Sequence, residues 1–168
     1  MQWYRIFAKA TGGTEFFVYK NWGLCLLLAG LVGAGLTGWA SDRFFQARRG
    51  PMAAICYGFM FIATFIMIGV IDGWQWGMSA TILIISTAVI GVHGIMSGTA
   101  TADFGGAKNT GIAVGLVDGL VYLGVGLQFL VIGFLVPTEA AAKDSANWAV
   151  WPMFLLPFAG IGFFLATR

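Results

Sequence analysis

Charge is scarce in this sequence. Charged residues make up 10% of its 168 positions, as nine Lys and Arg and seven Asp and Glu, whereas 59% of positions are hydrophobic. The mean hydropathy is +0.86. A soluble domain needs far more charge to cover its surface, so these values exclude a soluble fold and predict a membrane protein. The net charge of +2, without a basic cluster interleaved with aromatics, also excludes a nucleic-acid-binding surface.

Cysteine and histidine are nearly absent as well. The two cysteines, Cys25 and Cys56, fall near the starts of two successive apolar runs, and antiparallel helices would hold them farther apart than the roughly 7 Å reach of a disulfide. His93 is the single histidine. No phosphate loop, metal-ligand spacing or nucleophile beside a base is found. The sequence therefore predicts neither an enzyme nor a bound cofactor.

Long apolar runs are what the sequence does contain. A helix needs roughly 20 mainly apolar residues to cross a bilayer. Five segments reach that length: Trp22–Ala40, Pro51–Ile71, Gly77–Ala100, Thr110–Val136 and Trp148–Ala166. They are too long for barrel strands and lack the two-residue alternation of such strands. The predicted fold class is all-α, a polytopic membrane protein with a five-helix transmembrane domain over residues 22–168.

Residues 1–21 precede the first span and are more polar. We expect an interfacial or extramembrane segment, with its aromatic residues at the level of the lipid headgroups: Trp3, Tyr4, Phe16, Phe17 and Tyr19. In this topology the segment would have to cross the membrane with three basic residues and one acidic residue, and no signal peptide precedes Trp22. We therefore expect either that upstream sequence is missing or that a partner assists insertion.

The loop between the first two spans, Asp42–Gly50, holds three arginines. Short basic loops stay in the cytoplasm, so we expect this loop inside, together with Lys108 and Arg168. The bias is small, because this topology puts five basic residues inside and four outside. We predict an integral membrane protein of a bacterial inner membrane.

The third span carries a polar stripe. At 100° per residue, its members lie within about 40° of one another on a helix: Ser79, Ser86, His93 and Ser97. Ionisable residues inside a span usually face protein or water. His93 therefore either hydrogen-bonds a neighbouring helix or contacts a proton or a substrate in a cavity lined by this stripe.

The fourth span combines one acid with closely spaced glycines. Gly111, Gly115 and Gly119 are four residues apart, a pattern that favours close helix contact, and Asp118 lies on the same side. Small residues of the first span offer a complementary surface: Ala29, Gly30, Gly33, Ala34 and Gly38. We expect a packed seam in which Asp118 makes a structural hydrogen bond, with a proton relay as the alternative.

Two stretches of the sequence resemble a known family. GWASDRFFQARRGP (38–51) is similar to the loop between the eighth and ninth helices of major facilitator carriers, in the form seen in organophosphate and phosphate antiporters. TADFGGAKNTGIAVGLVDGLVYLG (101–124) resembles the stretch that leads into the eleventh helix of the same group. The likeness runs from about Tyr19 to the end and implies the carboxy-terminal half of a carrier.

The resemblance also implies roles for the loop. In the family, the loop acid and the glycine at the end of the eighth helix latch against the eleventh helix and control alternating access. On this basis Asp42 and Gly38 would form a conformational latch with basic partners from Arg43, Arg48 and Arg49. The counterpart of the third span lines the central cavity in the family, which agrees with the Ser79–Ser97 stripe.

The departures from the family limit what is carried over. The counterparts of the first six helices are absent, and no Arg or Lys lies inside the five predicted spans, although the antiporters bind phosphate through such arginines. The predicted function is a half-sized or truncated transporter-like protein that moves a small solute only if a second chain completes it. The alternative is a non-transporting accessory subunit of a larger membrane complex. Both imply a lipid bilayer and a further membrane protein chain as partners.

Overall fold

In the computed structural model most of the described part of the chain is helical. The structure describes residues 2–168, except for the side chain of Ala107. In chain order the helices are α1 (Trp3–Ala10), η1 (Gly13–Glu15), α2 (Phe17–Lys20), α3 (Trp22–Phe45), α4 (Arg49–Val70), α5 (Gln75–His93), η2 (Gly94–Ala100), α6 (Thr101–Leu135), η3 (Glu139–Lys143), η4 (Ser145–Ala149) and α7 (Val150–Ala166). Residues 2–168 contain no β-strand. The predicted all-α class is confirmed.

Five helical stretches are long and apolar enough to cross a membrane: Trp22–Phe45, Arg49–Val70, Gln75–Gly106, Lys108–Leu135 and Ser145–Ala166. They correspond to the five predicted spans. Helices suit such sequences because lipid offers no partner for a free backbone amide. The chain is therefore an integral membrane protein with five candidate spans.

The turn between the third and fourth spans is much tighter than predicted. The sequence suggested a loop between Ala100 and Thr110, but the third helical stretch continues to Gly106. Gly106 alone breaks the helix, with φ 58° and ψ 176°. A residue with a Cβ rarely adopts this backbone conformation, whereas glycine can. Gly106 therefore allows a one-residue turn where the predicted spans left a longer loop.

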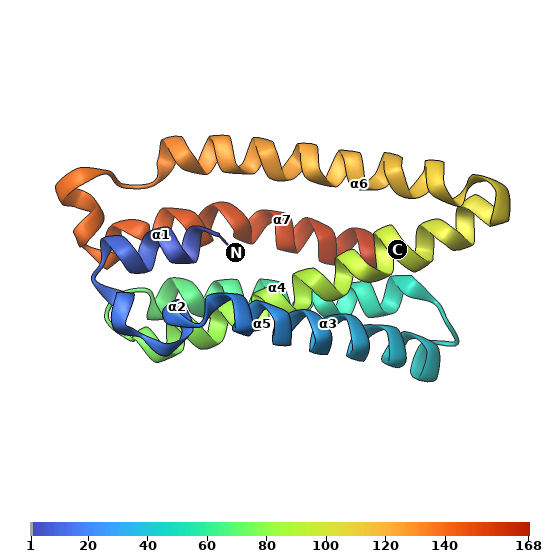
Figure 1. Cartoon of the computed structure of the whole chain (residues 1–168), viewed down its shortest axis with the longest axis horizontal. Coiled ribbons are helices and arrows are strands. Elements are labelled where there is room, and N and C mark those ends of the chain that lie inside the picture. The colour runs from blue at the N-terminus through green and yellow to red at the C-terminus, as the bar shows by residue number, and fades with distance from the viewer. Residues whose placement is uncertain (1) are drawn as a thin grey trace.

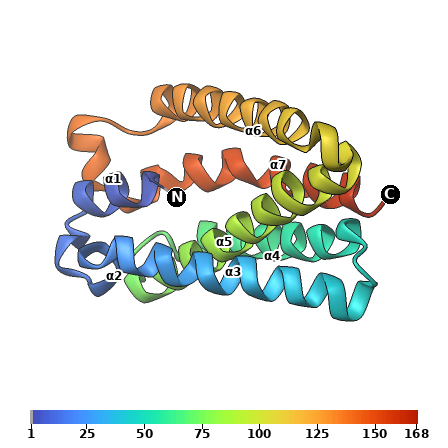
Figure 2. The same ribbon diagram turned by 45° about the vertical axis from the view of Figure 1, so that its right-hand side comes forward.

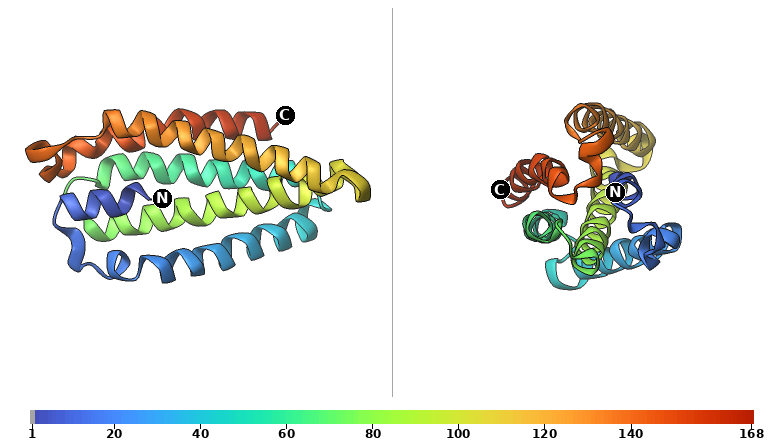
Figure 3. Two further views of the ribbon diagram at one scale, coloured as in Figure 1. Left: turned by 45° about the horizontal axis from the view of Figure 1, so that its top comes forward. Right: turned by 90° about the vertical axis from the view of Figure 1, so that its left-hand side faces the viewer.

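The long helices form an elongated bundle around α5 (Figures 1 and 2). α5 packs closely against α3 and α4, and α4 packs against α7. α6 runs along one edge of the bundle (Figure 3). Over an 18-residue apolar stretch of the third span, 56% is buried inside the protein, compared with 6% for the corresponding stretch of the Lys108–Leu135 span of α6. α6 therefore leaves most of its surface uncovered in this chain.

Two glycines bring α3 and α5 into close contact. A Cβ on Gly33 would overlap the backbone carbonyl of Thr87, and a Cβ on Gly91 would come within 2.6 Å of the Thr37 methyl group. Thr37 Oγ1 donates to the Gly33 carbonyl at 2.7 Å and lies 3.4 Å from the Gly91 carbonyl. Gly33 of the first span thus packs directly on the backbone of the third span.

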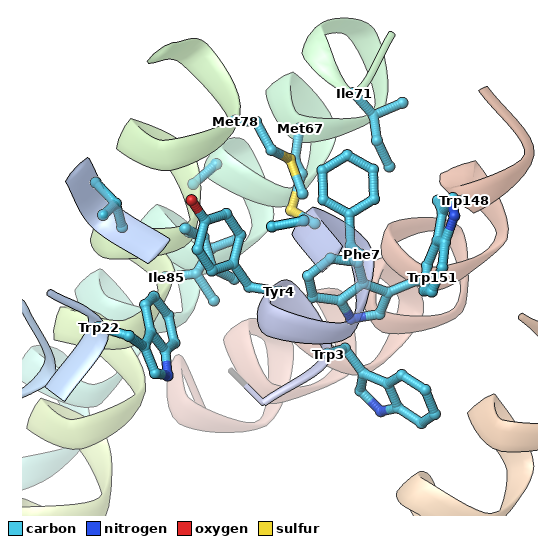
Figure 4. Packing of buried hydrophobic residues seen from close by; sticks show 14 of the residues in the cluster. Trp3, Tyr4, Phe7, Trp22, Met67, Ile71, Met78, Ile85, Trp148 and Trp151 are labelled. Atoms are coloured by element: carbon cyan, nitrogen blue, oxygen red, sulfur yellow. The ribbon is translucent and has the colours of Figure 1, made fainter. Parts of the chain in front are cut away.

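Helix α1 folds back into one end of the bundle. Trp3, Tyr4, Phe7 and Ala8 are buried there, and Figure 4 shows Phe7 near Ile71 and Trp151. The Phe7 ring lies 5.7 Å from that of Trp148 and 6.5 Å from that of Trp151. The structure buries the rings of Trp3 and Tyr4 among the helices, where neighbouring aromatic residues cover their apolar area. Their position at the level of the lipid headgroups stays a prediction.

The α1 helix also bridges two spans. The Tyr4 ring lies 4.9 Å from that of Trp22 on α3, and the Trp3 ring stacks 5.6 Å from that of Phe129 on α6. The Tyr4 and Ser79 hydroxyls share a hydrogen bond of 3.2 Å. Burial raises the pKa of the Tyr4 hydroxyl, which keeps it protonated and able to donate. At this end of the bundle α1 lies between α3 and α6.

Candidate functional site

The arginine loop is a tight turn between α3 and α4. After Phe45, Gln46 and Ala47 both take left-handed backbone conformations, with φ of 52° and 63°. The Ala47 amide donates to the Ser41 carbonyl at 3.0 Å, and the Arg48 amide donates to the Phe45 carbonyl at 2.9 Å. These bonds satisfy carbonyls that the end of α3 leaves open, and they fix where α4 begins.

Arg49 is the centre of a polar network at this turn. Its Nη1 donates to Asp42 Oδ1 at 2.7 Å and to Ser41 Oγ at 3.1 Å. Its Nε lies 3.7 Å from Asp103 Oδ2, near the start of α6. The Arg49 side chain is 17% exposed, so water and salt screen its charge less than they screen a charge on the surface. One guanidinium therefore joins the end of α3, the start of α4 and the start of α6.

The other predicted latch residues contribute differently. Arg43 and Arg48 are exposed, and within residues 2–168 no carboxylate lies within 4.0 Å of either. A Cβ added at Gly38 would meet nothing within 4 Å, so no helix approaches it closely. The structure thus brings together Asp42 and Arg49 from the predicted set, and leaves Gly38, Arg43 and Arg48 outside the network.

Sequence reasoning missed two members of this network, Ser41 and Asp103. Ser41 is fully buried and donates to the Arg48 carbonyl at 3.3 Å. Asp103 lies in the stretch 101–124 that resembles the family, and its acid beside a glycine pair was the available signal. The spacing along the chain could not show that this acid reaches Arg49.

The two ionisable residues deep in the spans face each other. His93 Nε2 on α5 lies 3.9 Å from Asp118 Oδ1 on α6, with side chains 39% and 34% exposed. The distance is too long for a hydrogen bond, and Asp118 Oδ1 is buried without any such partner. We expected Asp118 to point into a seam with the first span, but it points toward α5.

A π-helical segment starts directly after His93. This segment, η2, covers Gly94–Ala100. Ser97 Oγ donates to the His93 carbonyl at 2.8 Å and lies 3.5 Å from the His93 ring. Wide helical turns of this kind are often found at functional positions because they displace side chains from regular spacing. The segment joins α5 to α6 directly after His93.

The serines of the predicted stripe do not line one cavity. Ser79 is covered by Tyr4, and Ser86 is fully buried with its hydroxyl donating to the Ile82 carbonyl at 2.7 Å. Ser97 is buried as well, so His93 alone of the four is partly exposed. Within this chain α1 and the neighbouring helices cover the serines on that face of α5, and a cavity lined by the stripe stays a prediction.

The glycines of α6 are not packed. A Cβ on Gly111, Gly115 or Gly119 would meet nothing within 4 Å. The predicted seam with the first span is therefore not formed within this chain. The physical reason is that Gly33, on the small face of the first span, packs against the α5 backbone at Thr87 and Gly91 instead of against α6.

A small cavity of about 130 Å³ lies at the opposite end of the bundle from the arginine loop. Its lining includes Tyr4, Phe7, Phe16, Met78 and Trp74. It is formed where α1 and η1 meet the turn between α4 and α5. None of the predicted latch or intramembrane residues borders it.

Comparison with known proteins gives one informative match. No family model matches the chain, and no solved structure matches it. The chain is 28% identical, over 172 aligned residues, to the membrane sensor protein UhpC of Escherichia coli (strain K12). The alignment covers 93% of this chain and 36% of the relative, so the chain spans about a third of that protein's length. This similarity agrees with the resemblance stated for the loop and the fourth span.

Proposed function

From the resemblance of this chain to the carboxy-terminal half of a major facilitator carrier, we propose that it is a half-sized, transporter-like membrane protein that moves a small solute only together with a second chain. The Arg49 network carries this proposal. In an alternating-access carrier, charged contacts at one membrane face form in one of the two access states and break in the other. The contacts of Arg49 with Asp42 and Asp103, between the end of α3 and the start of α6, support such a role.

The need for a second chain follows from what the spans lack. Complete carriers place a solute between two similar halves at the bilayer midplane. This chain offers His93 and Asp118 within its spans, but none of the five spans predicted from the sequence contains an arginine or lysine that could bind an anion. A solute path would run along the exposed sides of α5 and α6, with the other wall supplied by the partner.

We propose that the arginine loop, Ser41–Arg49, faces the cytoplasm. Three arginines in a short loop favour that side, and the aromatic residues Trp74 and Trp76 at the other end suit the opposite interface. The similarity to a protein from Escherichia coli supports a bacterial inner membrane as the location.

A second candidate function is a non-transporting subunit that senses or stabilises a larger complex. The relative carries the description of a membrane sensor, and a sensor can keep a carrier's conformational switch without moving solute. The aromatic cluster around α1 supports this alternative, because the buried side chains of Trp3 and Tyr4 fill the space between spans at that end of the bundle.

A reconstitution experiment separates the two functions. The chain would be purified in mild detergent together with whatever polypeptide accompanies it, placed in liposomes, and tested for exchange of labelled inorganic phosphate and of a labelled sugar phosphate. Exchange by a two-chain particle that disappears in Arg49→Ala supports the transporter. Recovery in fixed ratio with a larger assembly, without exchange of either probe, supports the accessory subunit.

A further inference from the structure

The charged residues of this chain are unevenly divided between the two ends of the bundle (Figure 1). Four basic and four acidic residues lie at the α1 end: Arg5, Lys9, Lys20, Lys143, Glu15, Asp72, Glu139 and Asp144. Five basic and two acidic residues lie at the end with the arginine loop: Arg43, Arg48, Arg49, Lys108, Arg168, Asp42 and Asp103. The charges at the α1 end therefore balance, whereas the end with the arginine loop keeps an excess of positive charge.

Both acidic residues at the end with the arginine loop are already paired with Arg49. Its Nη1 donates to Asp42 Oδ1 at 2.7 Å, and its Nε lies 3.7 Å from Asp103 Oδ2. Arg43 and Arg48 are exposed, and within residues 2–168 neither guanidinium has a carboxylate within 4.0 Å. The positive charges of Arg43 and Arg48 therefore stay available to an anionic ligand.

The backbone that carries these two arginines is ordered. The Arg48 amide donates to the Phe45 carbonyl at 2.9 Å, and the Arg48 carbonyl accepts from Ser41 Oγ at 3.3 Å. Arg43 lies in the last turn of α3. Because both positions are fixed before a ligand arrives, binding costs less conformational entropy than it would on a flexible loop.

Arg48 borders a hollow with aromatic walls, which we call the arginine hollow. It has a volume of about 240 Å³, is open to the surroundings, and is lined by Phe44, Phe45, Gln46, Arg48 and Pro51. Phe44 is 65% exposed, and its ring lies 5.4 Å from that of Trp39, which is 59% exposed. The arginine hollow thus offers a positive charge beside apolar surface, as an amphipathic ligand requires.

The arginine hollow lies at the depth of the lipid headgroups. Helix α3 has 24 residues, which at 1.5 Å per residue extend about 36 Å and exceed the roughly 30 Å hydrocarbon core. The end of α3 and the start of α4 therefore reach the interface, where exposed tryptophans such as Trp39 are enriched. Basic side chains at this depth attract anionic lipids.

We propose that the arginine hollow binds one anionic phospholipid, whose phosphate is held by Arg48 and attracted by Arg43 and whose acyl chain lies along Phe44 and Trp39. Guanidinium groups donate paired hydrogen bonds to phosphate oxygens, and the aromatic rings cover apolar parts of the lipid. A zwitterionic lipid carries its own cation beside the phosphate, so it gains less from the two arginines. The lipid site requires neither transport nor a second chain, and so goes beyond the proposed function.

Native mass spectrometry with phosphatidylglycerol tests this proposal. The full chain would be purified free of lipid in an uncharged detergent, and the affinity of the first bound lipid molecule would be measured by titration. Phosphatidylcholine with the same acyl chains is the comparison lipid. The test variant combines Arg43→Ala with Arg48→Ala. The matched control combines Lys9→Ala with Lys143→Ala, which removes two exposed positive charges from the α1 end.

We expect phosphatidylglycerol to bind about tenfold more tightly than phosphatidylcholine. A basic residue near the membrane surface strengthens the binding of anionic lipid about fivefold, so loss of both arginines should weaken it roughly 30-fold. The control variant should change the affinity less than about twofold, because acidic residues offset the basic ones at the α1 end. Equal losses in the two double variants, or equal affinities for the two lipids, overturn the proposal.

A charge-preserving variant separates loss of the lipid site from loss of the fold. Arg43→Lys combined with Arg48→Lys keeps both charges but not the paired hydrogen bonds, so it should retain the affinity for phosphatidylglycerol within about fivefold. Affinity that falls as far as in the alanine variant would contradict a site built on these charges. Elution as a single symmetrical species in size-exclusion chromatography shows that each variant remains folded.

Two further measurements test the apolar walls and the source of the phosphate. Phe44→Ala should weaken phosphatidylglycerol binding about threefold, whereas Phe17→Ala, an exposed ring at the α1 end, should leave it unchanged. An excess of inorganic phosphate should displace no more lipid than chloride does at equal ionic strength. Selective displacement by inorganic phosphate would overturn the lipid assignment and give the arginines to a soluble anion.

Discussion

Arg49 and Asp103 meet at one end of the bundle although they belong to different spans, with Arg49 Nε 3.7 Å from Asp103 Oδ2. The same guanidinium donates to Asp42 Oδ1 at 2.7 Å. Two carboxylates therefore share one positive charge, and each belongs to a helix that a carrier would move. Breaking either contact should loosen one helix while leaving the other attached.

Replacing Arg49 tests the whole network. Arg49→Ala removes the shared cation and leaves Ser41 buried without its donor, so the free energy of unfolding should fall by about 1.5–3 kcal/mol. Equilibrium unfolding in a mixture of SDS and mild detergent measures this change. The matched control is Arg48→Ala, next in the chain but exposed, which should change the value by no more than about 0.5 kcal/mol. Equal losses in the two variants would show that Arg49 has no special role.

Replacing the two acids separates the helices that Arg49 joins. Asp42→Asn weakens the shorter contact and should increase labelling of cysteines placed at the loop end of α3, because that end gains freedom to move. Asp103→Asn should act on α6 instead. Rates of maleimide labelling at matched positions on the two helices give the result. Unchanged labelling on both helices in the Asp42→Asn variant would count against a latch.

The glycine contact between α3 and α5 should tolerate no side chain. In Gly33→Ala, the new methyl group meets the Thr87 carbonyl, and such overpacking should lower the free energy of unfolding by about 1–3 kcal/mol. Gly35→Ala on the same helix faces open space and should be neutral or stabilise by up to about 1 kcal/mol. The same SDS titration compares both variants. A neutral Gly33→Ala would mean that α3 and α5 lie farther apart.

The pair of His93 and Asp118 should couple weakly across α5 and α6. Polar pairs between membrane helices contribute on average about 0.6 kcal/mol in double-mutant cycles, and a separation of 3.9 Å predicts no more than that here. The cycle combines His93→Ala with Asp118→Asn and measures unfolding. His93→Ala combined with Asp103→Asn serves as the additive comparison. Preservation of both assembly and transport in Asp118→Asn would rule out a proton relay through this acid.

The aromatic end around α1 should depend on Phe7. Phe7→Ala leaves a space beside Trp148 and Trp151 and should lower the free energy of unfolding by about 3 kcal/mol. Hydrogen exchange should also speed up in residues 3–10. Phe17→Ala, which removes a ring that is 59% exposed, should leave both measurements close to those of the parent. Exchange in α1 that does not respond to Phe7→Ala would place the helix outside the core.

The comparison of sequence and structure is clearest in the glycines. Their spacing predicted close helix contact along α6, but in the structure a Cβ added to Gly111, Gly115 or Gly119 would meet nothing within 4 Å. Gly33 was assigned to a seam with the fourth span and packs on α5 instead. Spacing defines a face of a helix, whereas the neighbour of that face depends on how every other helix packs.

The polar residues follow the same division. The acid and arginines of the loop were recognised from the sequence, and Asp42 and Arg49 do form an ion pair. Asp103 was not foreseen as their partner, and the meeting of His93 with Asp118 was not foreseen either. Each of these contacts joins two spans, so local periodicity carries no information about it.

By itself the sequence determined that the chain crosses a membrane with five helices, because apolar length and the lack of charge leave no alternative in water or lipid. Only the tertiary structure decided which faces of those helices are covered. The burial of Trp3 and Tyr4 between α3 and α6 depends on helix α1 turning back into the bundle, a long-range event driven by aromatic burial.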